Sequence, residues 1–564
     1  MRALTAPLYE LSEFEEIRKL LKKPGKYAAL TGCVESQKLH MAYGLSEGLR
    51  CRLIVTFSDQ RMKELQEDYR FYDRNTTCFP ARDVIFYQAD IHGNQLTKER
   101  IRCLRRMMEG RPFTVVTTFG SLLAPQIPLS VFRDNVITVS CNGSLDEKKM
   151  AEELVKLGYE NVYQVEAPGQ FSIRGGIIDI FDLTEENPYR IELWGDDVES
   201  IRSFDVQSQR SIEKLSSITI YPACELILTE EQLKKGMERI EKESKKFSEK
   251  LRKEFKTEEA HRVEEQMNTL KEEVFAYKSL VNLDGYVRYF YEDTVSFLNC
   301  LDVENSIVFL DEPARIREHA SAVELEFRES MSHRLEKGYI LPGQADFLYS
   351  VAEVTARMSA FRLASLAALD LKGGLLKPDW KADISAKSIS SYNNSFEALV
   401  SDLQRYKKNG YRVLLLSGSR TRAKRLAADL SEDGLTSFYT EDPDREIKPG
   451  EIMTFYGRVF RGFEYPLLKF AVISESDIFG AEKKKKKKKK QYEGRKINDF
   501  SELSVGDYVV HENHGLGIYQ GIEKVEVEKV VKDYIKISYR DGGILYVLAT
   551  GLDVIQKYAS ADAK

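Results

Sequence analysis

The feature that most limits the fold is an alternation of short apolar runs with charged stretches of helical spacing over the first 135 residues. The runs Tyr27–Thr31, Leu53–Phe57 and Phe113–Thr117 have the length and apolar content of buried strands. Charged segments such as Leu96–Met108, with the spacing of a helix, lie between them. This β-α-β rhythm predicts an α/β domain, in which helices cover a parallel sheet.

The pattern changes over residues 136–222, where apolar and polar residues alternate. Gly175–Phe181 and Tyr189–Trp194 have the period of two that is typical of strands with one buried face. Gly195–Asp197 has the composition of a tight turn and leads into a third such run, Val198–Phe204. The sequence therefore predicts a β-rich α+β insert within the α/β domain.

Residues 223–355 begin with two charged segments of helical spacing, and strand and helix patterns then resume. We expect the two segments to be amphipathic helices that bury one stripe each. The first stripe is Leu233, Met237, Ile240, Phe247, Leu251 and Phe255; the second is Val263, Met267, Leu270 and Val274.

A second, smaller α/β domain is predicted over residues 356–480. A helix containing Phe396 and Leu403 ends near Gly410, and buried strands follow at Val413–Leu416 and Phe470–Ile473.

Eight consecutive lysines, Lys483–Lys490, come next. Such a run of like charges repels itself and stays solvated, so residues 481–498 are predicted to be a linker. Binding of nucleic acid by this run is an alternative.

Residues 499–564 contain short strand patterns with glycine-rich turns, which predict a small β-barrel. This segment holds 7 Lys+Arg and 11 Asp+Glu, a net charge of −4 that favours a protein partner over DNA.

Composition excludes several classes of protein. A length of 564 residues corresponds to about four domains. The formal net charge of −5 excludes a histone-like polycation. The seven cysteines are scattered without a CxxC pair, and no HExxH pattern occurs, so we expect neither disulfides nor a metal site. We find no apolar stretch of transmembrane length, and acids interrupt the apolar residues at the N-terminus, so we expect a cytoplasmic protein without a membrane span.

A weak phosphate-loop pattern follows the first predicted strand. A working loop has the form G-x-x-x-x-G-K-[ST], and Gly32 and Lys38 occupy two of these four positions. Gln37 replaces the second glycine, and its Cβ can keep the backbone from wrapping a phosphate. Leu39 replaces the residue that offers Mg²⁺ a hydroxyl oxygen. We therefore predict an inactive nucleotide site, with Lys38 as a solvated lysine at the start of a helix.

A second pattern of this kind lies far downstream. The buried run Ile307–Leu310 is followed by Asp311 and Glu312, as in ATPases that place a Mg²⁺ ligand and a water-orienting acid there. Without a competent phosphate loop these acids cannot support hydrolysis. The alternative is that they are strand-end acids that begin a helix.

One face of the insert has the composition of a protein-binding surface. Along Tyr189–Trp194, alternation places Arg190 and Trp194 on one side of the strand, and Arg174 lies on a neighbouring strand. Arginine and tryptophan are enriched in the residues that dominate binding energy at interfaces. The alternative is a tryptophan stacked on its own domain beside a surface arginine. No arrangement of nucleophile and base can be argued from spacing alone.

At this point the sequence resembles a known family. "RGGIIDIF" and "YRIELWGDDVESIRSFD" resemble the second domain shared by the excision-repair protein UvrB and the bacterial transcription-repair coupling factors. UvrB keeps a working phosphate loop, whereas Gln37 and Leu39 agree with the coupling factors. No aromatic insertion like the damage-probing hairpin of UvrB is found between Phe79 and Arg106.

The C-terminal segment agrees with this choice. "VGDYVVHENHGLGIYQGIE" and "YIKISYRDGGILYV" resemble the RNA-polymerase-interacting domain of coupling factors and CarD-like regulators, a Tudor- or SH3-like barrel. The resemblance covers essentially all of the chain. It implies the following organisation: 1–135, domain 1A with the degenerate loop; 136–222, the UvrA-binding domain; 223–355, domain 1B; 356–480, domain 3; 481–498, the linker; 499–564, the polymerase-interacting domain.

The resemblance also implies site residues. Arg174, Arg190 and Trp194 correspond to the family's contacts with UvrA, although phenylalanine is commoner at the last position. Lys524, Val525, Glu526 and Val527 correspond to an edge strand that docks on the β subunit of RNA polymerase, with Val525 central. In the family a helicase-like motor follows, which uses ATP and Mg²⁺ and acts on double-stranded DNA. We expect that motor outside these 564 residues.

The predicted function is therefore that of a monomeric adaptor in transcription-coupled nucleotide excision repair, with UvrA and RNA polymerase as partners. We expect no enzyme activity and no cofactor in this chain itself. The alternative is a UvrB-like ATPase that loads repair proteins on damage.

Overall fold

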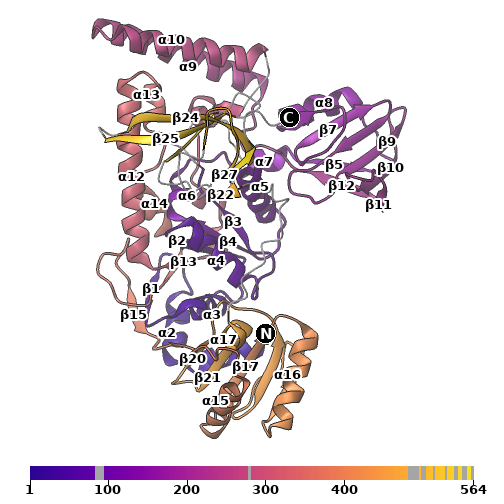
Figure 1. Cartoon of the computed structure of the whole chain (residues 1–564), viewed down its shortest axis with the longest axis vertical. Helices are drawn as coiled ribbons and strands as arrows, with labels where there is room; N and C mark the ends of the chain where they lie inside the picture. Colours follow the sequence, from indigo (N-terminus) through magenta and orange to yellow (C-terminus); the bar gives the residue numbers. More distant parts are fainter. Residues whose placement is uncertain are drawn as a thin grey trace.

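The computed structural model contains several sheets arranged along an elongated molecule (Figure 1). Among the residues that it describes, no helix is both long and apolar enough to cross a membrane. The described residues are 1–82, 94–276, 281–291, 293–480, 495–496, 503–511, 515–527, 530–538, 544–548 and 555–559.

A seven-stranded parallel sheet forms the centre of the molecule, with strand order β15-β1-β14-β13-β2-β4-β3. Its buried strands confirm the parallel sheet predicted from the first 135 residues. Helices α3, α4, α5 and α12 connect strands of this sheet or flank it. The strands are β1 (Tyr27–Thr31), β2 (Cys51–Thr56), β3 (Thr77–Phe79), β4 (Phe113–Thr118), β13 (Ser306–Asp311), β14 (Arg362–Leu366) and β15 (Trp380–Asp383). The helices are α3 (Glu35–Leu45), α4 (Asp59–Tyr69), α5 (Asn94–Met108) and α12 (Pro313–Glu336).

Two strands of the central sheet lie beyond the boundary that we predicted at residue 356. β14 pairs with β1 on one side and β13 on the other, and β15 forms the edge beside β1. Residues 362–366 and 380–383 therefore belong to the first sheet and not to the smaller α/β domain. Apolar periodicity marks a buried strand but does not reveal which sheet it joins, and this is the physical reason for the difference.

The insert predicted over residues 136–222 is antiparallel apart from one short pair of strands. Its main sheet has the order β11-β10-β9-β8-β7-β6, and β5 pairs separately with β12. Helix α8 (Glu147–Lys156) accompanies it. The strands are β5 (Ile137–Ser140), β6 (Glu160–Asn161), β7 (Gln170–Arg174), β8 (Ile177–Ile180), β9 (Tyr189–Trp194), β10 (Asp197–Phe204), β11 (Ser211–Leu215) and β12 (Ser217–Ile220).

The two predicted amphipathic helices are present as α9 (Glu230–Lys253) and α10 (Thr257–Lys271). Met237, Ile240 and Leu251 are buried as expected. The inclusion of Phe255 in the buried stripe was wrong. Helix α9 ends before it, and Phe255 lies in the connecting turn with φ of +61° and 94% of its surface exposed.

The smaller α/β unit packs below the central sheet in Figure 1. Its sheet has the order β16-β20-β21-β17-β19-β18, and the predicted helix and strands around Gly410 are confirmed. One buried apolar cluster joins it to the central sheet, because Leu414 and Phe463 share that cluster with Leu30. The elements are β16 (Lys387–Ser388), α15 (Phe396–Lys408), β17 (Arg412–Ser417), α16 (Arg420–Glu432), β18 (Ser437–Tyr439), β19 (Ile452–Tyr456), β20 (Phe463–Tyr465), β21 (Phe470–Ser474) and α17 (Glu475–Phe479).

The C-terminal segment forms a further sheet with the order β22-β27-β23-β24-β25-β26. Barrel closure stays a prediction, because β22 and β26 are the two ends of this order among the described strands. Lys483–Lys490 lie outside the described residues. The strands are β22 (Arg495–Lys496), β23 (Tyr508–His511), β24 (Gly515–Val527), β25 (Val530–Ser538), β26 (Ile544–Leu548) and β27 (Ile555–Ala559).

Candidate functional site

The outer face of the insert sheet carries all three side chains that we predicted to bind a partner. In the antiparallel register Asp179 of β8 lies opposite Arg190 of β9, and Arg174 of β7 lies opposite Ile177. Because alternate residues of a strand share one face, Arg174, Asp179, Arg190 and Trp194 lie on the same side of the sheet. The opposite side is apolar, and its Phe171, Ile178 and Ile191 pack in the core with Met150 and Leu154 of α8.

A buried carboxylate holds the two arginines in place. Arg190 donates from Nε to Asp179 Oδ1 at 2.7 Å and from Nη2 to Oδ2 at 2.8 Å. Arg174 donates to the same Oδ2 at 3.2 Å. The hydrogen bonds to Asp179 raise the pKa of the Arg190 guanidinium above its usual value. Bidentate pairing fixes the plane of a guanidinium, so Arg190 is held in one orientation, with 17% of its side chain exposed.

Two aromatic side chains of the insert are open to solvent, Trp194 on the same sheet face as the arginines and Tyr163 next to Arg174. Trp194, at the end of β9 before the turn at Gly195, has 81% of its surface exposed, and Tyr163 has 84% exposed. The Arg174 guanidinium lies 5.6 Å from the centre of the Tyr163 ring. Large exposed aromatics next to ordered arginines are the composition of a protein-binding hot spot. The alternative that Trp194 stacks on its own domain is wrong.

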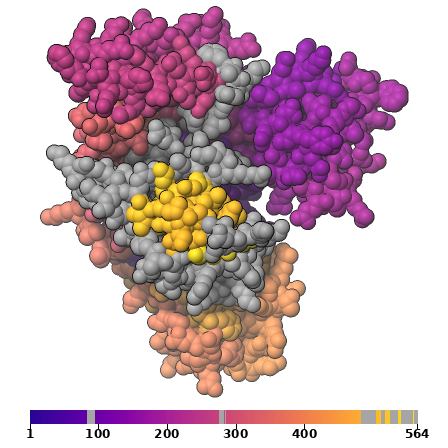
Figure 2. Space-filling model, turned by 45° about the horizontal axis from the view of Figure 1, so that its top comes forward, coloured from indigo at the N-terminus to yellow at the C-terminus, as the bar shows by residue number. Residues whose placement is uncertain are grey.

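The insert stands apart from the rest of the molecule at the upper right of the space-filling view (Figure 2).

Sequence reasoning missed two residues of this face, Asp179 and Tyr163. An acid in the middle of the apolar run Gly175–Phe181 was the available signal for the first, since a buried carboxylate needs a charged or hydrogen-bonding partner.

The strand–turn–helix at Gly32 is the second predicted site. β1 ends at Thr31, Gly32 has φ of +65°, and α3 begins at Glu35. A Cβ at Gly32 would lie 2.7 Å from Asp383 Oδ1, so glycine is required here by the fold itself.

The structure brings the two downstream acids to Lys38, in contrast to our prediction of a solvated lysine. Lys38 is 5% exposed, and its Nζ lies 2.8 Å from Asp311 Oδ1 and 2.6 Å from Glu312 Oε1. The two nearby carboxylates raise the pKa of Lys38, against the effect of burial, and the charges of Lys38 and Arg61 lower the pKa of Asp311. The prediction for Lys38 was wrong because its partners lie more than 270 residues away in the sequence.

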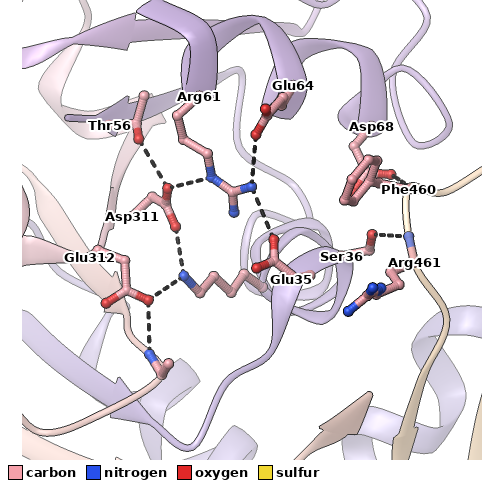
Figure 3. A network of polar contacts seen from close by, with 12 residues as sticks. Glu35, Ser36, Thr56, Arg61, Glu64, Asp68, Asp311, Glu312, Phe460 and Arg461 are labelled. Atoms are coloured by element: carbon pink, nitrogen blue, oxygen red, sulfur yellow. Dashed lines mark hydrogen bonds and ion pairs between the residues drawn. The ribbon is translucent and has the colours of Figure 1, made fainter. Parts of the chain in front are cut away.

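Other side chains complete this polar network, most of which Figure 3 shows. Asp311 Oδ2 accepts hydrogen bonds from Arg61 Nε at 3.1 Å and from Thr56 Oγ1 at 3.0 Å. Glu312 immediately precedes α12 with φ of +59°, and its Oε1 accepts from the Ala368 amide at 3.0 Å. The buried Asp311 is therefore shared between two cations, Lys38 and Arg61.

The two substituted loop positions have structural roles. Gln37 accepts from the Val34 amide through Oε1 at 3.1 Å and donates from Nε2 to the Tyr465 hydroxyl at 3.0 Å. Leu39 is buried and has no oxygen to offer. The start of α3 is therefore occupied by the chain's own groups, and these residues do not fit a Mg²⁺–nucleotide complex.

The C-terminal candidate residues lie in the long strand β24. Lys524, Val525, Glu526 and Val527 pair with β25, Val525 opposite Lys532. β23 pairs with β24 only at Gly515–Ile518. Within the described strands, the segment 524–527 therefore has a sheet neighbour on one side, as the edge-strand prediction requires.

Comparisons with known proteins match the two segments of the chain that contain these candidate residues. A family model described as the UvrB interaction domain matches residues 137–226, and the CarD-like/TRCF RID domain matches residues 503–559. The transcription-repair-coupling factor of Bacillus subtilis (strain 168) is 33% identical over 494 residues, which cover 87% of this chain and 41% of that protein. The factor of Staphylococcus aureus (strain MRSA252) is 27% identical over 569 residues, covering 100% of this chain and 48% of that protein.

The resemblance to transcription-repair-coupling factors is confirmed. The chain spans about half the length of the curated coupling factors that it matches. The face that carries Arg174, Arg190 and Trp194 lies within the UvrB interaction domain, and Val525 lies within the CarD-like domain. The roles of these residues in this chain stay predictions.

Proposed function

We propose that this chain is the recruiting part of a coupling factor, which binds UvrA through its insert and the β subunit of RNA polymerase through its C-terminal domain. The observation that carries the UvrA half of the proposal is the exposed Trp194 on the same sheet face as two arginines that the buried Asp179 aligns. The match to a CarD-like domain supports the second half.

In this proposal the chain acts as a cytoplasmic monomer in transcription-coupled nucleotide excision repair. ATP-driven movement on double-stranded DNA, which would displace a stalled polymerase, belongs to the remaining length of the coupling factors. We further propose that the C-terminal strands close into a small Tudor- or SH3-like barrel, which would present segment 524–527 to a strand of the polymerase.

Arg190→Ala and Trp194→Ala are each expected to weaken UvrA binding by more than about 1 kcal/mol, as truncation of hot-spot residues does. The measurement is the dissociation constant of purified UvrA for the whole chain. Lys149→Ala is the matched control, because Lys149 is exposed on α8, on the opposite side of the sheet. Unchanged affinity in both variants would show that UvrA binds elsewhere.

Val525→Arg is expected to abolish binding to RNA polymerase while the sheet stays folded, because a long charged side chain would oppose addition of a strand at this edge. Capture of polymerase by immobilised chain measures the effect, and circular dichroism checks the fold. Val505→Arg is the matched control, because Val505 belongs to the same domain, is 65% exposed and lies outside segment 524–527. A folded Val525→Arg variant that still captures polymerase would contradict the docking proposal.

The alternative function is a UvrB-like ATPase. We propose instead that the loop at Gly32–Leu39 hydrolyses no ATP, because Lys38 is neutralised by Asp311 and Glu312 and Leu39 has no metal-binding oxygen. The same acids would otherwise be needed for Mg²⁺ and water.

A further inference from the structure

A cavity of about 1040 Å³ separates the smaller α/β unit from the end of α4, and it belongs to neither proposed protein-binding surface. Its wall on one side comes from the turns after β17, β18, β19 and β21. Its opposite wall comes from the N-terminal residues, α3 and the segment after α4. The lining residues that the proposal assigns to a ligand are Arg70, Arg74, Tyr456 and Phe479.

The cavity lies where open α/β sheets bind ligands. β17, β18, β19 and β21 run parallel, so their carboxyl ends meet at one edge. β17 leads through α16 to β18, beyond β19 on one side, whereas β19 leads to β20, beyond β21 on the other. The connections after β17 and β19 therefore cross each other's strands. The turns that follow the four parallel strands line the cavity at this carboxyl edge, where ligands of α/β sheets usually bind.

The charge of the lining favours an anion. Five arginines (Arg70, Arg74, Arg420, Arg422 and Arg458) and three glutamates (Glu67, Glu441 and Glu475) line the cavity. Arg420 pairs with Glu441 at 3.2 Å, and Arg422 pairs with Glu475 at 2.7 Å. Arg70 and Arg74 are exposed, and neither makes an ion pair within the described part of the chain. Two guanidinium groups are thus available on the wall formed by the end of α4.

The turn after β17 already binds one oxyanion, which comes from the protein. The Gly418 amide donates to Glu475 Oε2, and Arg422 pairs with Oε1 of the same carboxylate. An arginine that faces a backbone amide across a carboxylate is the arrangement that also binds a phosphate group. Because Glu475 occupies this position, a ligand's negative charge would be held by Arg70 and Arg74.

Aromatic rings of the lining supply a second kind of contact. Tyr456, at the end of β19, and Phe479, at the end of α17, are exposed at the cavity. The Arg420 guanidinium lies 5.6 Å from the centre of the Tyr456 ring. Exposed rings of this kind stack on the planar face of a nucleobase. A volume of about 1040 Å³ is ample for a small ligand with both a base and phosphates.

We propose that this cavity binds a nucleoside phosphate, with its phosphates on Arg70 and Arg74 and its base against Tyr456 or Phe479. The ligand is bound without hydrolysis, and the site is separate from the strand–turn–helix at Gly32. A free nucleotide and the terminal nucleotide of a nucleic-acid strand both carry a base and a phosphate, so the test compares these two sources of the ligand.

Isothermal titration of the whole chain with ADP tests the proposal. We expect saturable binding that Arg70→Ala combined with Arg74→Ala weakens by about tenfold or more, because two charge-assisted hydrogen-bonding groups are lost. Glu475→Gln is expected to tighten binding by about threefold or more, because it removes a negative charge from the cavity. Arg425→Ala is the matched control, since Arg425 lies on α16, is 81% exposed and is not part of the lining.

Further arms identify the source and the role of the base. Tighter binding of a 5′-phosphorylated dinucleotide than of ADP, with the same loss in the Arg70→Ala, Arg74→Ala variant, would support the site with a strand end as its ligand. Inorganic phosphate is expected to bind more weakly than ADP. Absence of saturable ADP binding at millimolar concentration, or an affinity that the double variant and Glu475→Gln leave unchanged, would overturn the proposal, as would binding that requires a long oligonucleotide.

Discussion

Lys38→Met is expected to lower the free energy of unfolding by about 3–5 kcal/mol, the range for removal of one partner from a buried ion pair. Methionine keeps most of the apolar stem and removes the charge. Asp311 and Glu312 then both lose their ion pair with Lys38, and Arg61 pairs with Asp311 but not with Glu312. Urea unfolding at neutral pH, followed by circular dichroism, measures the change.

Lys19→Met is the matched control. Lys19 also forms a pair with a glutamate, Glu16, at 2.8 Å, but both side chains are more than half exposed. Exposed pairs of this kind contribute about 0–1 kcal/mol, so the control should unfold nearly as the unmodified chain does.

The Lys38→Met variant also distinguishes the two functional interpretations of the site at Gly32–Leu39. If Lys38 is structural, the substitution lowers the free energy of unfolding, and the unmodified chain has no ATP hydrolysis that could be lost. A phosphate-binding lysine would behave in the opposite way, because an empty loop contributes little to stability. ATP hydrolysis by the unmodified chain that disappears in Lys38→Met, with unfolding unchanged, would therefore restore the ATPase alternative.

The features that sequence could predict are those set by local periodicity. The β-α-β rhythm indicated the parallel sheet, and the period of two along Tyr189–Trp194 was enough to place Arg190 and Trp194 on one face. Alternation works for this face because its opposite side is fully apolar, and a shift of one residue would bury the arginine.

The features that escaped prediction depend on contacts between distant segments. The acids that pair with Lys38 follow β13, whereas Lys38 follows β1, and β14 from beyond residue 356 lies between these two strands and pairs with both. The cavity at the carboxyl ends of the smaller sheet likewise needs the order β21-β17-β19-β18, which no local pattern encodes. The prediction that Phe255 is buried was wrong for a local reason. The helical spacing of apolar residues continues to Phe255, whereas helix α9 ends at Lys253.

Glu225→Gln is expected to destabilise the chain by about 3–5 kcal/mol at neutral pH, because it leaves a buried arginine without its counter-charge. Arg100 of α5 is 1% exposed, and its Nε lies 2.7 Å from Glu225 Oε1. Its Nη2 donates to Gln126 Oε1 at 3.0 Å, and its guanidinium stacks 3.9 Å from the centre of the Phe79 ring. Gln126 precedes the insert and Glu225 follows β12, so one guanidinium joins both chain segments that connect the insert to the central sheet.

The pH dependence of the free energy of unfolding distinguishes the charge interaction of Arg100 and Glu225 from an effect of packing alone. The nearby positive charges of Arg100 and Arg82 lower the pKa of Glu225 from 4.5 to about 2, against the effect of burial. A carboxyl group with a depressed pKa stabilises the fold above its unfolded pKa, and the contribution is lost as the pH falls from about 4.5 towards 2. The linkage between protonation and folding makes this shift in the pKa of Glu225 equivalent to about 3 kcal/mol in the free energy of unfolding.

The difference in stability between the unmodified chain and Glu225→Gln should therefore be largest from pH 5 to 7 and should narrow steadily as the pH falls to 3. Urea unfolding over this range measures it, and hydrogen exchange at residues 125–127 and 222–228 reports the junction directly. A difference that stays constant with pH would mean that the ion pair contributes nothing beyond packing. A difference that narrows, with faster exchange at the junction in the variant, would show that Arg100 and Glu225 hold the UvrB interaction domain against the central sheet.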